Sequence, residues 1–208
     1  MEEGLTALAD EVRTIPDPVV YATLVGDRLW GTDGDALDLR ACHVIPARAL
    51  LGLRAPADSF ARTVHRGEVE FELCSHDAKK VAMMLLKKNG CIAEQILSPH
   101  VIATSEAHAE LREIVPLCAS RHWAHHFQSQ ARLHDQVGRP DYARRVRLCG
   151  IHLLRSGEIV SDLPTLETLV DDGSPEALAD AAQTSALPPM ASDEARARLD
   201  DWLVRLRL

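Results

Sequence analysis

Carboxylates at short spacing follow a glycine-containing segment near the N-terminus. Gly26 and Gly31 interrupt the chain, and Asp35 and Asp38 follow within a few residues. Phosphoryl and nucleotidyl transfer need divalent cations, which clustered carboxylates hold. Glycine lets backbone N–H groups approach phosphate oxygens closely. The segment therefore predicts a phosphate site in which Asp38 faces a metal ion.

A second pair of carboxylates lies farther along the chain. Between residues 69 and 73 three apolar residues alternate with Glu70 and Glu72, which is the period of a pleated strand. Both carboxylates should then share one face. Taken alone, this alternation is more typical of a solvated strand face than of a metal site.

The periodicity of the chain predicts the elements that would position these groups. A helix over residues 2–14 should end before Pro16 and Pro18. Strands are expected over 19–25, 37–45 and 69–73, with a turn or short helix between the first two. Further helices are expected from 78 to about 88, over 91–97, 105–114, 118–136 and 140–155, and in an amphipathic segment near the C-terminus. The fold class is therefore α/β (α+β): a small mixed sheet with flanking helices in residues 1–100, then a mostly helical region in residues 101–208.

The helix after residue 77 brings charge near the second carboxylate pair. Ser75, in the segment Ser-His-Asp, is expected to cap this helix. Lys79 and Lys80 lie close to its start. They are most simply its solvated side, although phosphate contact is the alternative.

Composition limits the possible partners. The chain has 208 residues, a formal net charge of -8 and a pI near 5.7, which argues against a generally basic nucleic-acid-binding surface. Its five cysteines form no C-x-x-C pair, as expected for reduced thiols. The first residues lack the pattern of a signal peptide, and no apolar stretch approaches the ~20 residues of a membrane span. We expect a soluble, cytoplasmic protein with no membrane partner.

Four blocks in the same order resemble the nucleotidyltransferases of the DNA polymerase β superfamily. The first runs from Tyr21 to Gly31 and continues as Asp-Ala-Leu-Asp-Leu-Arg over residues 35–40. The second spans Val-Glu-Phe-Glu-Leu-Cys-Ser-His-Asp-Ala-Lys-Lys and the following Leu-Leu-Lys-Lys-Asn-Gly segment to Ser-Pro at 98–99. The last two are Arg-His-Trp-Ala-His-His-Phe and Cys-Gly-Ile-His-Leu-Leu-Arg-Ser-Gly-Glu-Ile. Together they cover most of residues 19–165.

This resemblance implies the transfer of a nucleoside monophosphate from an NTP, with Mg²⁺ or Mn²⁺, to an acceptor that is RNA, a protein or a small molecule. It implies Asp38 and Glu72 as catalytic residues. The metal ligands would come from Asp38, Glu72, Glu70 and Asp35, with Glu72 favoured over Glu70. The residues that it implies for nucleotide binding are Gly26, Asp27, Arg28, Gly31, Arg40, Lys79 and Lys80.

Two residues depart from the family pattern. Ala36 stands where the resemblance places the first metal-binding aspartate, so that Asp33 or Asp35 would have to substitute. Asp27 stands where a small residue or serine would meet the phosphates, and its charge would repel a triphosphate. The alternative function is therefore a catalytically inactive nucleotidyltransferase fold that acts as a nucleotide-binding or protein-interaction module.

A group of histidines offers a weaker metal hypothesis. His122, His125 and His126 follow Cys118 at spacings that share a helix face. The spacing matches no closed four-ligand zinc site. Helix packing or a polar lining of a cleft is the favoured interpretation.

Overall fold

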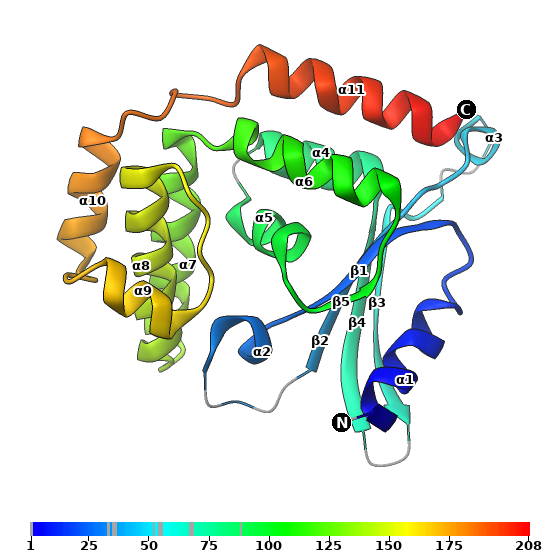
Figure 1. Cartoon of the computed structure of the whole chain (residues 1–208), viewed down its shortest axis with the longest axis horizontal. Coiled ribbons are helices and arrows are strands. Elements are labelled where there is room, and N and C mark those ends of the chain that lie inside the picture. Colours follow the sequence, from blue (N-terminus) through cyan, green and yellow to red (C-terminus); the bar gives the residue numbers. More distant parts are fainter. Residues whose placement is uncertain are drawn as a thin grey trace.

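The strands form one mixed sheet. The computed structural model describes residues 2–32, 34, 37–51, 53, 56–66, 69–87 and 89–208. Within these ranges the chain forms a five-stranded sheet in the order β3-β4-β2-β1-β5 (Figure 1). The strands are β1 (Val19–Val25), β2 (Leu37–His43), β3 (Ser59–Arg66), β4 (Val69–Asp77) and β5 (Val101–Ala103). The central pair β2 and β4 is parallel, and every other pairing is antiparallel.

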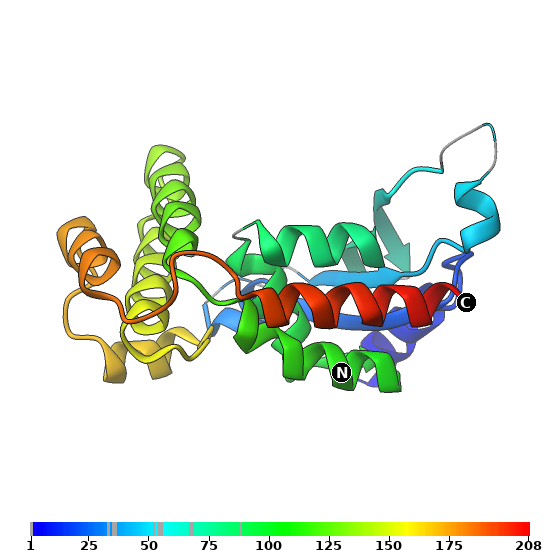
Figure 2. The ribbon, with the colours of Figure 1, turned by 90° about the horizontal axis from the view of Figure 1, so that it is seen from above.

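Helices surround the sheet and continue beyond one end of it. The helices are α1 (Glu2–Val12), α2 (Asp27–Trp30), α3 (Ala47–Leu50), α4 (Ala78–Leu86), α5 (Gly90–Leu97), α6 (Glu106–Cys118), η1 (Arg121–Trp123), α7 (Ala124–Gln136), α8 (Pro140–Ser156), α9 (Leu163–Leu169), α10 (Pro175–Thr184) and α11 (Asp193–Arg207). Figure 2 shows α7 to α10 gathered at one end of the molecule and α3 at the other. The predicted α/β (α+β) class with a helical second half is confirmed.

Each face of the sheet packs on its own apolar cluster. On one face, Leu39, Phe71 and Leu73 pack with Leu8 and Val12 of α1. On the other face, residues of β1 and β2 join a larger cluster that runs through α4, α5 and α6 into α7, α8, α10 and α11. This cluster contains residues from both sides of position 100. The division of the chain at that position stays a prediction.

The helix at the C-terminus packs along α6 and returns to the sheet. Trp202 is buried, and its indole N–H donates to the Ala107 carbonyl at 3.0 Å. Arg207 Nη2 lies 2.6 Å from Asp77 Oδ2, at the end of β4. The Asp77 carboxylate also accepts the backbone N–H of Ile45 at 3.0 Å. Asp77 therefore ties together the end of β4, the segment after β2 and the end of the chain.

The predicted cap at Ser75 is wrong. Ser75 lies inside β4, where it is buried and its Oγ is 2.7 Å from His43 Nδ1. The helix is capped by Asp77, which accepts the Lys79 backbone N–H at 3.0 Å. The cap moves because β4 pairs with β2 as far as His43↔Asp77, so the strand continues four residues beyond its predicted end.

Two strands were not expected from the sequence. β3 is largely exposed at one edge of the sheet, so its residues lack a regular apolar alternation. β5 has only three residues, at the opposite edge. Over the described ranges, no helix combines the length and apolar character needed to cross a membrane.

Candidate nucleotide site

A glycine turn lies directly against Asp38. Gly26 follows β1 with φ +69° and ψ −146°, and its carbonyl accepts the N–H groups of Leu29 and Trp30 as α2 begins. A Cβ at this position would lie 2.7 Å from Asp38 Oδ2. Both the positive φ and the close approach require glycine. The backbone of the turn is therefore held at the predicted metal-binding carboxylate.

The parallel pairing of β2 with β4 brings the second carboxylate to the same place. Asp38 is the register partner of Glu72, and Leu39 is the partner of the buried Leu73. Because successive side chains alternate between the faces of a sheet, Asp38 and Glu72 share the face opposite the α1 cluster. Glu70 lies two residues earlier and pairs with His65 of β3, with 3.2 Å between Oε2 and Nδ1. The structure brings Glu72 to Asp38, and it does not bring Glu70.

Arg40 bridges the two carboxylates. Its Nη1 lies 2.6 Å from Glu72 Oε1, and its Nη2 lies 3.5 Å from Asp38 Oδ1. Burial raises the pKa of the Asp38 carboxyl; the Arg40 guanidinium opposes this shift, while the Glu72 and Asp27 carboxylates add to it. The net pKa is above the usual aspartate value. Asp38 and Glu72 supply two carboxylates beside the single guanidinium of Arg40, an arrangement that favours binding of a further cation.

The donor set on the sheet fits a divalent metal. Asp38 and Glu72 offer carboxylate oxygens, the hard ligands that Mg²⁺ and Mn²⁺ prefer. Asp35, a further predicted ligand, lies outside the described residues, as do Asp33 and Ala36. Within the part of the chain that the structure describes, no group of three or more His, Cys, Asp or Glu side chains could hold a metal ion. The described ligands are therefore a pair of carboxylates that Arg40 also contacts.

A pocket of about 440 Å³ opens beside the glycine turn. It is lined by Asp27, Arg28, Thr32, Gly34 and Leu37. Arg28 is exposed, which leaves its guanidinium accessible from solvent. Of the residues predicted to bind nucleotide, Asp27 and Arg28 line this pocket directly.

Gly31 connects the turn to the helical half of the chain. It ends α2 with φ +64°. A Cβ there would lie 2.7 Å from Asp162 Oδ1 and 2.9 Å from Pro164 Cδ, at the start of α9. Gly31 therefore allows α9 to pack closely on the turn.

Asp27 is enclosed by groups from both halves of the chain. The residue is only 6% exposed. Its Oδ1 accepts hydrogen bonds from Thr32 Oγ1, at 2.6 Å, and from the Tyr142 hydroxyl of α8. Neither Tyr142 nor Thr32 was expected at the site from the sequence. No local pattern could have revealed Tyr142, since it lies 115 residues from Asp27 in the sequence.

The two lysines lie at the other end of β4. Lys80 Nζ is 3.0 Å from Asp58 Oδ1, and both lysines line a pocket of about 390 Å³ with methionines of α4. Asp77, which caps α4, lies five positions after Glu72, which corresponds to roughly 16 Å along the strand. The structure does not bring Lys79 and Lys80 to the carboxylate pair.

The histidines are spread over different surroundings. Cys118 is buried in the core, and His126 Nε2 lies 3.3 Å from Cys91 Sγ. The rings of His122 and His125 meet edge to face, with centroids 5.4 Å apart.

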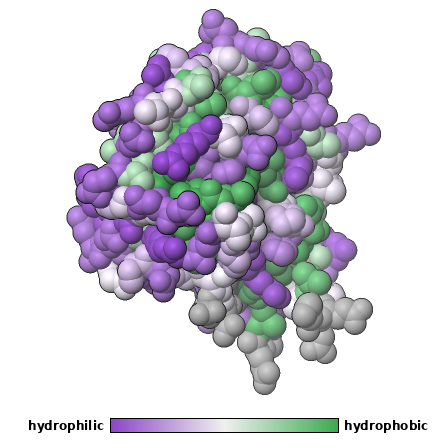
Figure 3. Space-filling view, turned by 60° about the vertical axis from the view of Figure 1, so that its left-hand side comes forward, coloured by the Kyte–Doolittle hydropathy of each residue, from purple (hydrophilic) through white to green (hydrophobic). Residues whose placement is uncertain are grey.

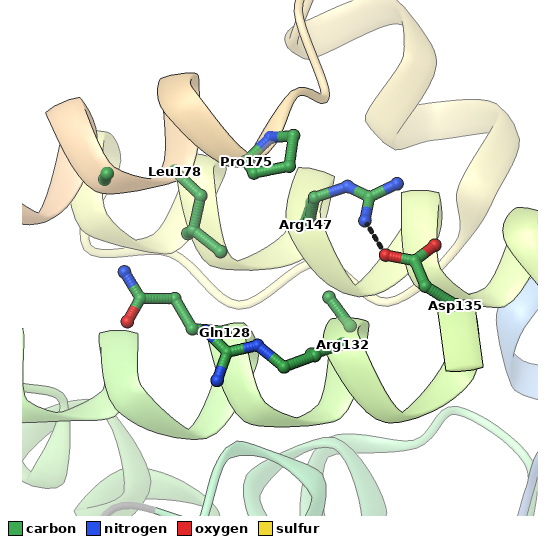
Figure 4. A pocket seen from close by; sticks show the side chains of 8 residues that line it. Gln128, Arg132, Asp135, Arg147, Pro175 and Leu178 are labelled. Carbon is green, nitrogen blue, oxygen red and sulfur yellow. Dashed lines mark hydrogen bonds and ion pairs between the residues drawn. The ribbon is translucent and has the colours of Figure 1, made fainter.

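The helical end of the molecule has a pocket of its own. It measures about 330 Å³ and lies between α7, α8 and α10 (Figure 4). Arg147 and Asp135 form an ion pair of 2.8 Å at its edge. Figure 3 shows the molecule with this side turned forward, where hydrophilic side chains predominate and hydrophobic ones form several patches between them. None of the predicted site residues lines this pocket.

A match to a known protein family covers the part of the chain that contains the glycine turn and the sheet. Residues 2–160 match the model of a family named RlaP and described as the RNA repair pathway DNA polymerase beta family. No curated protein matches the chain. Among solved structures, the chain is similar to a nucleotidyltransferase-like protein from Exiguobacterium sibiricum 255-15, at 13% identity and a TM-score of 0.36. That alignment covers 99% of this chain and 73% of the other.

Proposed function

This chain belongs to the RNA repair pathway DNA polymerase beta family, and we propose that it transfers a nucleoside monophosphate from an NTP to an acceptor hydroxyl. One observation carries the proposal. The parallel register of β2 and β4 sets Asp38 beside Glu72, directly against the Gly26 turn. A glycine turn next to paired carboxylates can bind phosphates and a divalent cation together.

The residues of the candidate site have separate roles in this proposal. The Gly26 turn brings backbone close to the phosphates, and Arg28 and Arg40 neutralise the charge that develops on them. Asp38 and Glu72 would hold Mg²⁺ or Mn²⁺, which would polarise the α-phosphate and favour ionisation of the acceptor hydroxyl. The acceptor hydroxyl gives up its proton to solvent, its oxygen forms a bond to the α-phosphorus, and the bond from the α-phosphorus to the leaving pyrophosphate breaks.

The acceptor is proposed from the family alone. A family described by RNA repair makes the terminal hydroxyl of an RNA the first acceptor to test. The net charge of -8 means that RNA would have to be held by a local patch. Hydroxyl groups of proteins and of small molecules are the other two classes. A cytoplasmic location belongs to the same proposal, and the five cysteines, all free, suit a reducing compartment.

The Arg40 bridge favours a second candidate function. A guanidinium already paired with Asp38 and Glu72, together with alanine at position 36, suits a protein that binds nucleotide without turning it over. Such a protein would act as a nucleotide-binding or protein-interaction module.

Transfer from an NTP labelled at the α-phosphate separates the two candidates. Wild type is expected to label one acceptor class in the presence of Mg²⁺ or Mn²⁺, and Asp38→Ala and Glu72→Ala should reduce labelling to background. Glu70→Ala is the matched control, because it removes the same charge from the same face of β4 but its side chain is 67% exposed and paired with His65. Equal activity in Asp38→Ala would refute the proposed site. Nucleotide binding by wild type without labelling of any acceptor would favour the second candidate.

A further inference from the structure

We propose that Tyr142 is a positioning residue for nucleotide binding. Together with Thr32 it donates a hydrogen bond that fixes the Asp27 carboxylate and weakens its repulsion of the triphosphate. The inference rests on the proposed function. It also gives α8, in the helical half of the chain, a defined part in the site.

The surroundings of Asp27 show how far its carboxylate is confined. Two hydroxyl groups donate to the same oxygen, Oδ1. The second oxygen, Oδ2, faces Gly34 so closely that a Cβ at Gly34 would lie 1.9 Å from it. The carboxylate is thus held from three sides, at the first residue after Gly26.

The charge of Asp27 reaches the site. Asp27 directly follows Gly26, where a Cβ would lie 2.7 Å from Asp38 Oδ2. Asp27 also shares its pocket with Arg28, which is the exposed cation at the turn. An uncompensated carboxylate here would repel phosphate oxygens, whereas two hydroxyl donors localise and partly neutralise its charge.

Neighbouring side chains fix the Tyr142 ring, and the hydroxyl is the group that reaches Asp27. The ring stacks on His134 with centroids 5.5 Å apart, and it meets Trp30 edge to face at 5.7 Å. Arg139 lies over it at 5.5 Å. The hydrogen bond to Asp27, followed by burial, raises the pKa of the Tyr142 hydroxyl. The group therefore stays protonated and donates.

The backbone that carries Tyr142 is also held rigidly. Three residues along α8, Arg145 forms a buried ion pair with Glu94 of α5, at 3.0 Å. The Arg145 guanidinium lies over the Trp30 ring, 4.3 Å from its centroid, and Trp30 Nε1 lies 3.3 Å from Glu94 Oε2. Loss of the Tyr142 hydroxyl alone should leave this framework in place.

The test measures the dissociation constant of an NTP analogue with a non-hydrolysable α,β bridge, by calorimetry, for wild type and variants. Tyr142→Phe should weaken binding by about three- to tenfold, because the Asp27 carboxylate then keeps only one of its two hydroxyl donors and repels the phosphates more strongly. In an Asp27→Asn background the same substitution should change the constant by less than about twofold, because the charge through which Tyr142 acts is then absent. The matched control is Tyr21→Phe, because the other tyrosine of the chain is buried and its hydroxyl has no hydrogen-bond partner among the described residues.

Each outcome has a clear meaning. A Tyr142→Phe protein that binds the analogue as tightly as wild type would overturn the inference. So would an equal loss in the Asp27→Asn background, since this would mean that Tyr142 acts through the fold and not through the Asp27 charge. If wild type itself fails to bind the analogue, the proposed function falls, and the inference with it.

Discussion

Arg40 competes with a divalent cation for the same two carboxylates, which makes Arg40→Gln the most informative single change. Its guanidinium donates to Glu72 Oε1 and lies within ion-pair distance of Asp38 Oδ1. Metal binding to Asp38 and Glu72 requires that at least part of this contact be given up. Removing the guanidinium should therefore tighten the binding of a free cation.

The size of the effect follows from exposure. The side chains of Arg40 and Asp38 are 19% and 26% exposed, whereas that of Glu72 is 49% exposed, so solvent screens part of the pair. A half-buried charged hydrogen bond of this kind contributes about 1–2 kcal/mol. We expect Arg40→Gln to bind Mn²⁺ about tenfold more tightly than wild type, which corresponds to about 1.4 kcal/mol.

Electron paramagnetic resonance can measure free Mn²⁺ during a titration without nucleotide. Arg62→Gln is the matched control, since it removes the same charge from a residue that pairs with Glu11, away from Asp38. Adding Asp38→Asn to Arg40→Gln should abolish the gain. Equal Mn²⁺ affinity in wild type and Arg40→Gln would refute the competition, and so would a gain of the same size in Arg62→Gln.

Three further predictions concern stability. The folded protein raises the pKa of Asp38 above 3.8, so its stability falls as the pH rises from 3.8 through the folded pKa. Asp38→Asn should therefore melt at or above the wild-type temperature at pH 7 and lose that advantage below pH 3.8. A clearly lower melting temperature of the variant at pH 7 would contradict this. Glu94→Gln or Arg145→Met should each cost about 3–5 kcal/mol in denaturant titrations, because both side chains are 3% exposed, and the double variant should cost less than the sum of the two; additive losses would argue against the pair. Trp202→Ala should cost about 3–5 kcal/mol, whereas Val204→Ala, 57% exposed on the same helix, should change stability by less than about 0.5 kcal/mol, and similar losses in both would contradict the packing of α11.

The strands that lie inside the sheet could be predicted where their side chains are regularly buried. The run over residues 19–25 is almost wholly buried in β1, and its predicted bounds are those observed. β3 was not predicted because a strand at an exposed sheet edge does not need regularly alternating apolar residues. The predicted end of β4 was too early, because pairing with β2 prolongs the strand. The paired residues are 34 positions apart in the sequence, so local sequence preferences could not indicate this pairing.

In the candidate site, too, some residues could be predicted from the nearby sequence, whereas others depend on contacts between distant segments. Asp38 and the Gly26 turn could be identified from residue types and spacing. The choice between Glu70 and Glu72 depends on the register of two parallel strands, which periodicity alone leaves open. Tyr142 gave no indication at all, because its function depends on a contact between α8 and the turn after β1.

The contact between Arg207 and Asp77 has a consequence for synthesis of the protein. The two residues are 130 positions apart, and Arg207 belongs to α11, which follows all five described strands of the sheet in the sequence. During translation the Asp77 carboxylate is complete long before its guanidinium partner leaves the ribosome. A sheet that forms before α11 has been synthesised forms with this carboxylate still lacking the Arg207 cation, and α11 docks on it afterwards. A nascent chain stalled before α11 should thus be more open to proteases at the start of α4 than the finished protein.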